Sequence, residues 1–407
     1  MARFIFVFIS CFIFAGPSWA AESLTIERIN SSPELEGSSP RSLSFSQNGK
    51  RLTFLQASPE NIDVLDLWEY DLMTGKPRLL VAAKSLASGP VSEEEQARRE
   101  RMRISQGGIT ERHISNSGSQ IVIPSGGDLY LHQGSPSVER LTRTKGVEID
   151  IKFSPRDGFV SYVRDQNLYL FDLKSRREIP VSSEGRGAVS FGTAEFIAQE
   201  EMHRYTGYWW SKDEALIALT RVDETPVKVV DRYDINAAGV TVTRQRYPEA
   251  GSANAKVRLG IVRVADLRKG SRRIQWVPIK SDDFYLADVK WTPDRKLIYQ
   301  VQSRDQKKLE VLSFDPTTGQ SKTLLTETDP QWVNLNEGWR WLTKQPQFIW
   351  VSDKSGHKHI YLHETSGKLN RQLTSGDWDV DEVKGLDEET GFVYFTATKK
   401  SPLESHF

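Results

Sequence analysis

A short unit recurs along this chain and limits the folds that the chain can adopt. Each copy has an aromatic or apolar residue, then Ser or Thr, then a turn rich in Pro, Asp, Asn and Gly, and then a β-branched run. This pattern is typical of hairpins, because the turn residues reverse the chain between two extended segments. Residues 341–343 form a degenerate sixth copy, and the five clear copies begin at Phe45-Ser46, Ile114-Ser115, Phe153-Ser154, Trp210-Ser211 and Trp291-Thr292.

The repeats predict an all-β fold of the β-propeller type. In a propeller, four-stranded units of roughly 40–50 residues pack face to face around a central channel. The copies are unevenly spaced, so we expect long inserted loops in several units. Two β-sandwich domains are the alternative, but no composition break or linker divides the chain, which favours one propeller.

The first twenty residues read as a secretory signal. Arg3 precedes an apolar run over residues 4–15, and Ser18-Trp19-Ala20 has the small-x-small pattern of a cleavage site. A transmembrane anchor is the alternative, although the run is shorter than the roughly 20 apolar residues that span a bilayer; a lipidated Cys11 is another. We therefore predict a signal peptide over residues 1–20, one propeller domain over residues 21–407, and export to the periplasm or the medium.

Composition excludes some partners. Lys plus Arg and Asp plus Glu are equal at 54 each, and no long block of one sign occurs, so charge gives no reason to expect nucleic acid or an anionic membrane as a partner. The chain has one cysteine, Cys11, which would leave with the signal. A peptide or small-molecule partner remains open.

One predicted insertion is helical. Ser92 and Glu95 have the spacing of a capping box, and Glu94 and Glu95 each lie four residues before an arginine, which supports a short charged helix over about residues 92–104. Arg98 and Arg99 lie on it.

Four segments resemble the dipeptidyl peptidase IV branch of the prolyl oligopeptidase family. The similarity runs from about residue 43 to the C-terminus and is strongest in AEFIAQEEMHRYTGYWWS (194–211), TRVDETPV (220–227), RYPEAGSAN (246–254) and YLADVKWTPD (285–294). The resemblance implies an eight-bladed propeller that caps an α/β-hydrolase domain. It also implies that the pair Glu200 and Glu201 binds the free amino terminus of a peptide substrate.

Elementary chemistry supports that role for Glu200 and Glu201. A peptide α-amine has a pKa near 7.7–8.0 and is mostly protonated at neutral pH, and two carboxylates can replace the water that it loses on binding. If a serine attacks the peptide bond two residues from the fixed amino terminus, the enzyme releases dipeptides. A solvated acidic turn is the structural alternative for the pair.

The resemblance implies a further contact. Bacterial members of the family use an arginine from a helical insertion to hold the substrate backbone, and Arg98 and Arg99 are the candidates here. Because guanidinium groups suit carbonyl and carboxylate acceptors, the assignment is chemically reasonable. A salt-bridged surface helix is an equally good interpretation of either arginine.

The chain contains no Gly-x-Ser-x-Gly elbow for a serine nucleophile. In the family, the nucleophile, acid and histidine all follow the propeller. We therefore expect this chain to stop before the hydrolase domain, with about seven blades, and to be inactive alone; cleavage after Pro or Ala and a homodimer are implied by the resemblance only. No zinc or nucleotide motif suggests a metal or cofactor. The alternative function is a stand-alone envelope propeller that binds a peptide or protein without catalysis.

Overall fold

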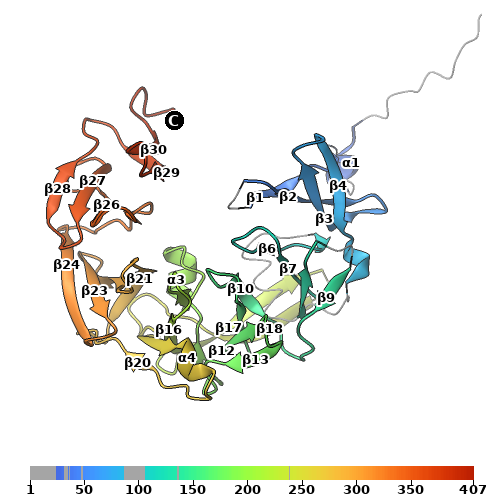
Figure 1. Cartoon of the computed structure of the whole chain (residues 1–407), viewed down its shortest axis with the longest axis horizontal. Helices are drawn as coiled ribbons and strands as arrows, with labels where there is room; N and C mark the ends of the chain where they lie inside the picture. The colour runs from blue at the N-terminus through green and yellow to red at the C-terminus, as the bar shows by residue number, and fades with distance from the viewer. Residues whose placement is uncertain are drawn as a thin grey trace, which may run out of the picture.

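The computed structural model describes residues 24–31, 35, 37–46, 49–86, 106–134, 137–237 and 239–407. Within these ranges, six sheets of four or five strands, antiparallel except for one short parallel pair, follow one another along the chain, together with two sheets of two strands. Figure 1 shows the sheets as an arc with the N-terminal sheet at one end and the C-terminal strands at the other. The prediction of an all-β propeller is confirmed, and the two-sandwich alternative is wrong.

We number the larger sheets as blades 1 to 6. Blade 1 contains β1 (Arg41–Phe45), β2 (Leu52–Ser58), β3 (Asn61–Asp71) and β4 (Lys76–Val81), with β5 (Gly107–Gly108) parallel to β3. Blade 2 contains β6 (His113–Ile114), β7 (Ile121–Ser125), β8 (Asp128–His132) and β9 (Val138–Arg140). Blade 3 contains β10 (Ile149–Phe153), β11 (Phe159–Arg164), β12 (Asn167–Asp172) and β13 (Arg177–Pro180).

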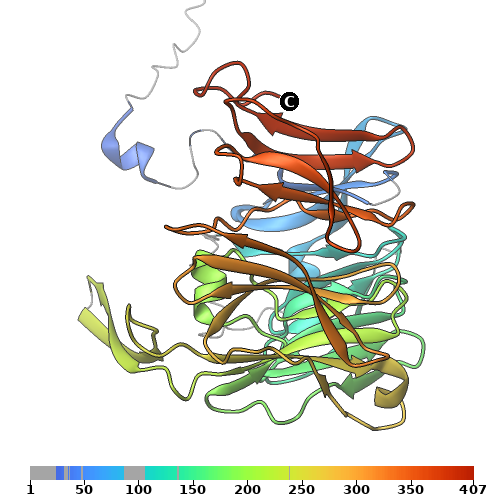
Figure 2. The same ribbon diagram turned by 90° about the vertical axis from the view of Figure 1, so that its left-hand side faces the viewer.

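Blade 4 carries an inserted hairpin, and two short strands share one edge of one of its long strands. It contains β14 (Val189–Phe191), β15 (Tyr208–Trp210), β16 (Leu216–Asp223), β19 (Lys256–Arg263) and β20 (Gln275–Trp276), and both β14 and β15 pair with β16. The hairpin of β17 (Val229–Asn236) and β18 (Gly239–Arg246) is inserted in this blade, and Figure 2 shows it projecting from the stacked sheets.

Blades 5 and 6 are regular. Blade 5 contains β21 (Phe284–Trp291), β22 (Leu297–Ser303), β23 (Lys308–Asp315) and β24 (Gln320–Thr328). Blade 6 contains β25 (Arg340–Trp341), β26 (Gln347–Ser352), β27 (His359–Glu364) and β28 (Leu369–Gln372), and a seventh, two-stranded sheet of β29 (Val380–Asp387) and β30 (Phe392–Ala397) follows.

Helices are short and few in the described part of the chain. They are α1 (Ile26–Ile29), the 3₁₀ turn η1 (Ala83–Ser85), α3 (Phe196–Glu201) and α4 (Val264–Leu267). None of them has the length and apolar character needed to cross a membrane. The predicted signal and the predicted helix over residues 92–104 lie outside the described residues.

The structure explains the recurring Ser or Thr. In blade 3, the Ser154 N–H donates to the Phe159 carbonyl (2.9 Å), and the Phe159 N–H donates to the Ser154 hydroxyl (2.8 Å). The hydroxyl thus satisfies a backbone donor where the chain enters the next strand. The degenerate copy has Leu342 at this position and keeps only the backbone bond, whereas both bonds recur at Ser46, Ser115, Ser211 and Thr292.

The apolar core is divided among the junctions between neighbouring sheets. Between blades 4 and 5, for example, Leu259 and Ile261 pack in one cluster with Tyr299 and Phe314. Corresponding clusters fill the other junctions. The first lies between blades 1 and 2, and the last lies between blade 6 and the sheet of β29 and β30. Because interiors pack densely, these contacts fix each blade against its neighbours, and with it the segments that each blade carries.

Candidate functional site

A short helix, α3, interrupts blade 4 between β14 and β15. Glu195 precedes it with extended backbone (φ −69°, ψ 164°) and makes no side-chain capping bond to the helix. Ala198 is fully buried, and the Gln199 side-chain amide donates to the Ala194 carbonyl (2.6 Å). The helix therefore packs on its apolar side and ends in two exposed residues, Glu200 and Glu201.

These two glutamates do nothing evident for the helix itself. Carboxylates near a helix C-terminus face the negative end of the helix dipole, which is unfavourable by about 0.3–1 kcal/mol each. The last turn of α3 has no basic residue, and no ion pair joins Glu200 or Glu201 to another described residue. The stability of α3 therefore does not explain why two glutamates stand at its end.

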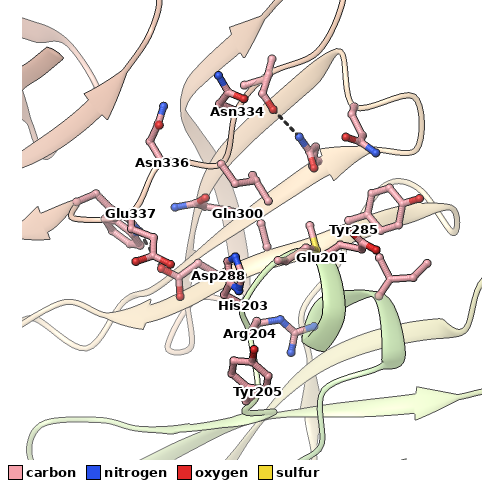
Figure 3. Close-up of a pocket in the computed structure, with 18 of the residues that line it drawn as sticks. Glu201, His203, Arg204, Tyr205, Tyr285, Asp288, Gln300, Asn334, Asn336 and Glu337 are labelled. Carbon is pink, nitrogen blue, oxygen red and sulfur yellow. Dashed lines mark hydrogen bonds between the residues drawn. The ribbon is translucent and has the colours of Figure 1, made fainter. Parts of the chain in front are cut away.

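A cavity of about 960 Å³ opens beside α3. Its lining comes from the α3 segment, the residues after β18, strands β21 and β22, the segment that leads into β25, and strand β29. Glu201 is one of the lining residues, and Glu200 is not. Figure 3 shows Glu201, His203 and Arg204 on one side, with Gln300, Asn334, Asn336 and Glu337 facing them.

Arg204 is the buried cation of this cavity. It is 6% exposed, and its guanidinium lies 2.6 Å from the equally buried Glu195 carboxylate. The same guanidinium donates to the carbonyls of Leu286 on β21 and of Thr206, each at 2.9 Å. Buried charge is costly unless it is paired and hydrogen-bonded, and here the charge of Arg204 meets three acceptors.

The chain turns sharply between Glu201 and Arg204. His203 has left-handed backbone (φ +52°), an uncommon conformation for a residue other than glycine. The turn allows the Arg204 N–H to reach the Ala198 carbonyl (2.9 Å), so that the chain folds back beneath α3. Left-handed residues of this kind often follow a helix C-terminus, and this one places the His203 side chain in the cavity lining.

The far wall carries a second ion pair. Asp288 on β21 accepts the Trp339 indole N–H (2.8 Å), and the Lys290 ammonium lies 3.1 Å from the same carboxylate. Lys290 also lies over the Trp339 ring, 4.0 Å from its centroid. Burial lowers the pKa of Lys290, and the nearby Asp288 carboxylate opposes that shift.

Amide side chains complete this wall. Gln302 donates to the Val333 carbonyl (2.9 Å), and Asn334 donates to Asp353 (2.7 Å). Gln300 is 3% exposed, and its side-chain nitrogen has no hydrogen-bond partner in the described structure. The cavity therefore combines carboxylates with amides, a lining that suits a ligand with both charged and neutral polar groups.

The structure brings only part of the predicted site together. Arg98 and Arg99 lie outside the described residues. Sequence reasoning missed Asp288, Lys290 and Trp339, although the first two lie in a segment that carried the family resemblance. Within the described residues, no group of three His, Cys, Asp or Glu side chains could hold a metal ion.

Comparisons with known proteins agree with this architecture. The family model of the dipeptidyl peptidase IV N-terminal region matches residues 114–407. A probable dipeptidyl-aminopeptidase B of Emericella nidulans is 27% identical over 282 residues, which are 62% of this chain and 31% of the relative. A probable dipeptidyl peptidase 4 of Aspergillus flavus is 26% identical over 301 residues, 68% of this chain and 38% of the relative.

Among solved structures, the dipeptidyl peptidase 4 of Porphyromonas gingivalis superposes with a TM-score of 0.73 at 23% identity, over 90% of this chain and 51% of that one. This likeness concerns the fold. Together with the cavity described above, it defines the class of protein as a β-propeller with a polar cavity at its inner strands. The chain belongs to the dipeptidyl peptidase IV family, and it contains that family's N-terminal region. The match spans about a third of the length of the curated relatives.

Proposed function

We propose that this chain is the substrate-binding propeller of a dipeptidyl aminopeptidase, in which Glu200 and Glu201 bind the protonated amino terminus of a peptide. The observation that carries the proposal is the placement of Glu201. Its carboxylate lies in the cavity lining without a cationic partner among the described residues. Two cations of the cavity, Arg204 and Lys290, are already paired with Glu195 and Asp288.

The proposed reaction needs a hydrolase domain beside the propeller. Binding the amine at a fixed point sets which peptide bond reaches the serine, so that cleavage would release dipeptides. The named relatives are dipeptidyl aminopeptidases and peptidases, which supports this reaction class. Cleavage after Pro or Ala, gating of access by the propeller, and the contribution of Arg98 or Arg99 to backbone binding belong to the same proposal.

Calorimetric titration of the chain with alanyl-proline and with N-acetyl-alanyl-proline tests the proposal. We expect the free-amine ligand to bind and the acetylated ligand to bind much more weakly. Glu201→Ala should weaken free-amine binding about 10–100-fold, the value of one charge-assisted hydrogen bond, and Glu200→Ala should weaken it less. Glu184→Ala removes an exposed glutamate outside the cavity and should change nothing. Equal binding of both ligands would contradict the proposal.

Affinity for the free amine should also depend on pH. The ligand must carry its proton, so binding should weaken as the pH rises through about 7.7–8.0, the range in which an α-amine deprotonates. The acetylated ligand has no such group and serves as the control. A free-amine affinity that is constant between pH 7 and pH 9 would contradict an ammonium–carboxylate contact.

Export and dimer formation are also part of the proposal. The pattern of residues 1–20 supports export, and N-terminal sequencing of protein recovered from the periplasm or the medium would test cleavage after Ala20. Light scattering of the purified chain would test for a homodimer.

A further inference from the structure

We propose that Arg204 is a positioning residue for the amine site: paired with Glu195, it fixes α3 against blade 5 and so sets where Glu201 lies in the cavity. This inference rests on the proposed function, because it concerns the same carboxylate. Arg204 itself binds no substrate in this account. It acts through the backbone that it holds.

The three acceptors of Arg204 belong to different parts of the site. Glu195 stands at the start of α3, Thr206 lies between α3 and β15, and Leu286 lies on β21 of blade 5. One planar guanidinium therefore connects the residue before α3 and the segment after α3 to blade 5. A lysine ammonium is a point charge on a flexible stem and cannot reproduce this fork of donors.

A second set of contacts holds the same segment from the other side. In blade 3, the Lys152 ammonium lies 3.1 Å from Asp150 and donates to the Tyr208 carbonyl (3.1 Å). The Thr206 hydroxyl donates to Asp150 (2.6 Å). Residues 204–208 are thus tied to blade 3 and to blade 5, which leaves the turn at His203 and the helix above it little freedom.

Movement of Arg204 would be passed directly to Glu201. Two residues separate them, and one of these is the left-handed His203. The Arg204 N–H also bonds to the Ala198 carbonyl in the middle of α3. A shift of the guanidinium away from Leu286 would therefore change both the end of the helix and the direction in which its last carboxylate points.

The pairing with Glu195 has an electrostatic consequence. Both side chains are about 95% buried, and an unpaired buried cation is strongly unfavourable. Neutralised by Glu195, Arg204 does not repel an incoming ammonium ion. Without Glu195, its positive charge would stand in the lining of the cavity that the amine enters.

Arg204→Lys is the first test, with Arg164→Lys as the matched control. Arg164 is similarly buried (8%) and is paired with Glu178 at 2.7 Å and 2.8 Å, but it does not line the cavity. We expect both variants to lower the melting temperature, but only Arg204→Lys to weaken alanyl-proline binding, by about tenfold, because the Glu201 carboxylate is then no longer held in position. An equal loss of affinity in both variants, or unchanged affinity in Arg204→Lys, would overturn the inference.

Glu195→Gln tests the electrostatic part. It keeps the shape of the side chain but leaves Arg204 unneutralised, so alanyl-proline should bind more weakly while N-acetyl-alanyl-proline is unaffected. Hydrogen exchange of residues 196–206 distinguishes an electrostatic loss from a structural one, because the side-chain carbonyl of the Glu195→Gln variant can still accept from Arg204 and the segment should exchange as in the wild type. If these amides exchange as fast in Glu195→Gln as in Arg204→Lys, the loss of affinity is structural and the electrostatic argument is wrong.

Hydrogen exchange separates this inference from the proposed function. Amides of residues 196–206 should exchange faster in Arg204→Lys than in the wild type, and this segment should be unchanged in Arg164→Lys. This readout needs no ligand. If the wild-type chain does not bind alanyl-proline, the proposed function fails, but faster exchange would still support the positioning role. If exchange in the segment is unchanged, the positioning role fails whatever the ligand does.

Discussion

Two buried arginines in neighbouring blades make similar ion pairs in different settings. Arg164 at the end of β11 pairs with Glu178 on β13 of the same sheet, and it lies 3.4 Å from Glu148 where blade 3 meets blade 2. Arg204 ties an inserted helix to blade 5 and lines the cavity. Burial and pairing are common to both, so neither feature identifies a functional residue; contact with the cavity does.

The surroundings of Arg204 and Arg164 also differ in how completely the buried charged groups are paired and hydrogen-bonded. Arg204 and Glu195 are equally buried and closely paired. At the junction of blades 2 and 3, Glu148 accepts from the Thr144 hydroxyl (2.9 Å), but its second carboxylate oxygen is buried without a hydrogen-bond partner in the described structure. We therefore expect changes at Arg204 and Glu195 to affect mainly ligand binding. Changes at Arg164 and Glu148 should affect mainly the stability of the chain and its dependence on pH.

The largest expected effect is that of Arg164→Met on stability. Removing the guanidinium leaves Glu148 and Glu178 without their cation, and breaking a buried pair costs about 3–5 kcal/mol of unfolding free energy. Urea denaturation measures the loss, and Arg156→Met, at an exposed turn residue, should stay within about 0.5 kcal/mol of the wild type. If the folded fraction of Arg164→Met also loses dipeptide affinity, the contrast between the two arginines breaks down.

Glu148 should make stability depend on pH. Burial raises its pKa to about 7, opposed by Thr144 and Arg164 and assisted by Asp128. The unfolded carboxyl has a pKa near 4.3, so the folded state binds more protons between these values. The stabilising contribution is therefore complete below about pH 4 and is lost as the pH rises through about 7.

Glu148→Gln removes this titration. At about 1.4 kcal/mol per pKa unit, the stability of the variant should exceed that of the wild type by about 4 kcal/mol at pH 8 and match it at pH 4. Urea unfolding at the two pH values measures the difference, and the exposed Glu184→Gln is the control. A stability difference between Glu148→Gln and the wild type that is the same at pH 4 and at pH 8 would show that the junction is more solvated than its geometry indicates.

The smallest effect concerns the backbone beneath α3. His203→Val should destabilise the chain by about 1–2 kcal/mol, because left-handed backbone is unfavourable for a residue with a Cβ branch. His203→Gly should cause no loss, since glycine adopts this conformation freely. Melting temperatures of the two variants decide the point. A destabilised glycine variant would mean that the His203 side chain, and not its backbone, holds the turn.

Sequence patterns predict the regular part of this molecule better than its site. The turns at Ser154 and its equivalents could be recognised because their hydrogen bonds join residues only four or five positions apart, so the pattern is local. The degenerate copy at Leu342 could be recognised for the same reason, since it lacks only the hydroxyl. The number of strands per unit followed from the propeller interpretation.

The site depends on contacts between blades, which no local pattern contains. Asp288 and Trp339 are 51 residues apart and meet because blades 5 and 6 pack together. Glu200 and Glu201 are equivalent as a sequence pair, but the short helix places only Glu201 in the cavity lining. Arg204 belonged to the segment that carried the family resemblance, and its role became visible only through its partners on β21 and at the start of α3.

A crystal structure of the chain with bound alanyl-proline would show directly where the peptide amine lies. We predict that the ligand nitrogen lies within hydrogen-bond distance of the Glu201 carboxylate, about 2.7–3.2 Å, with Arg204 still paired to Glu195. A dipeptide bound elsewhere, or bound in the cavity with its amine directed away from α3, would show that Glu201 does not anchor the amino terminus.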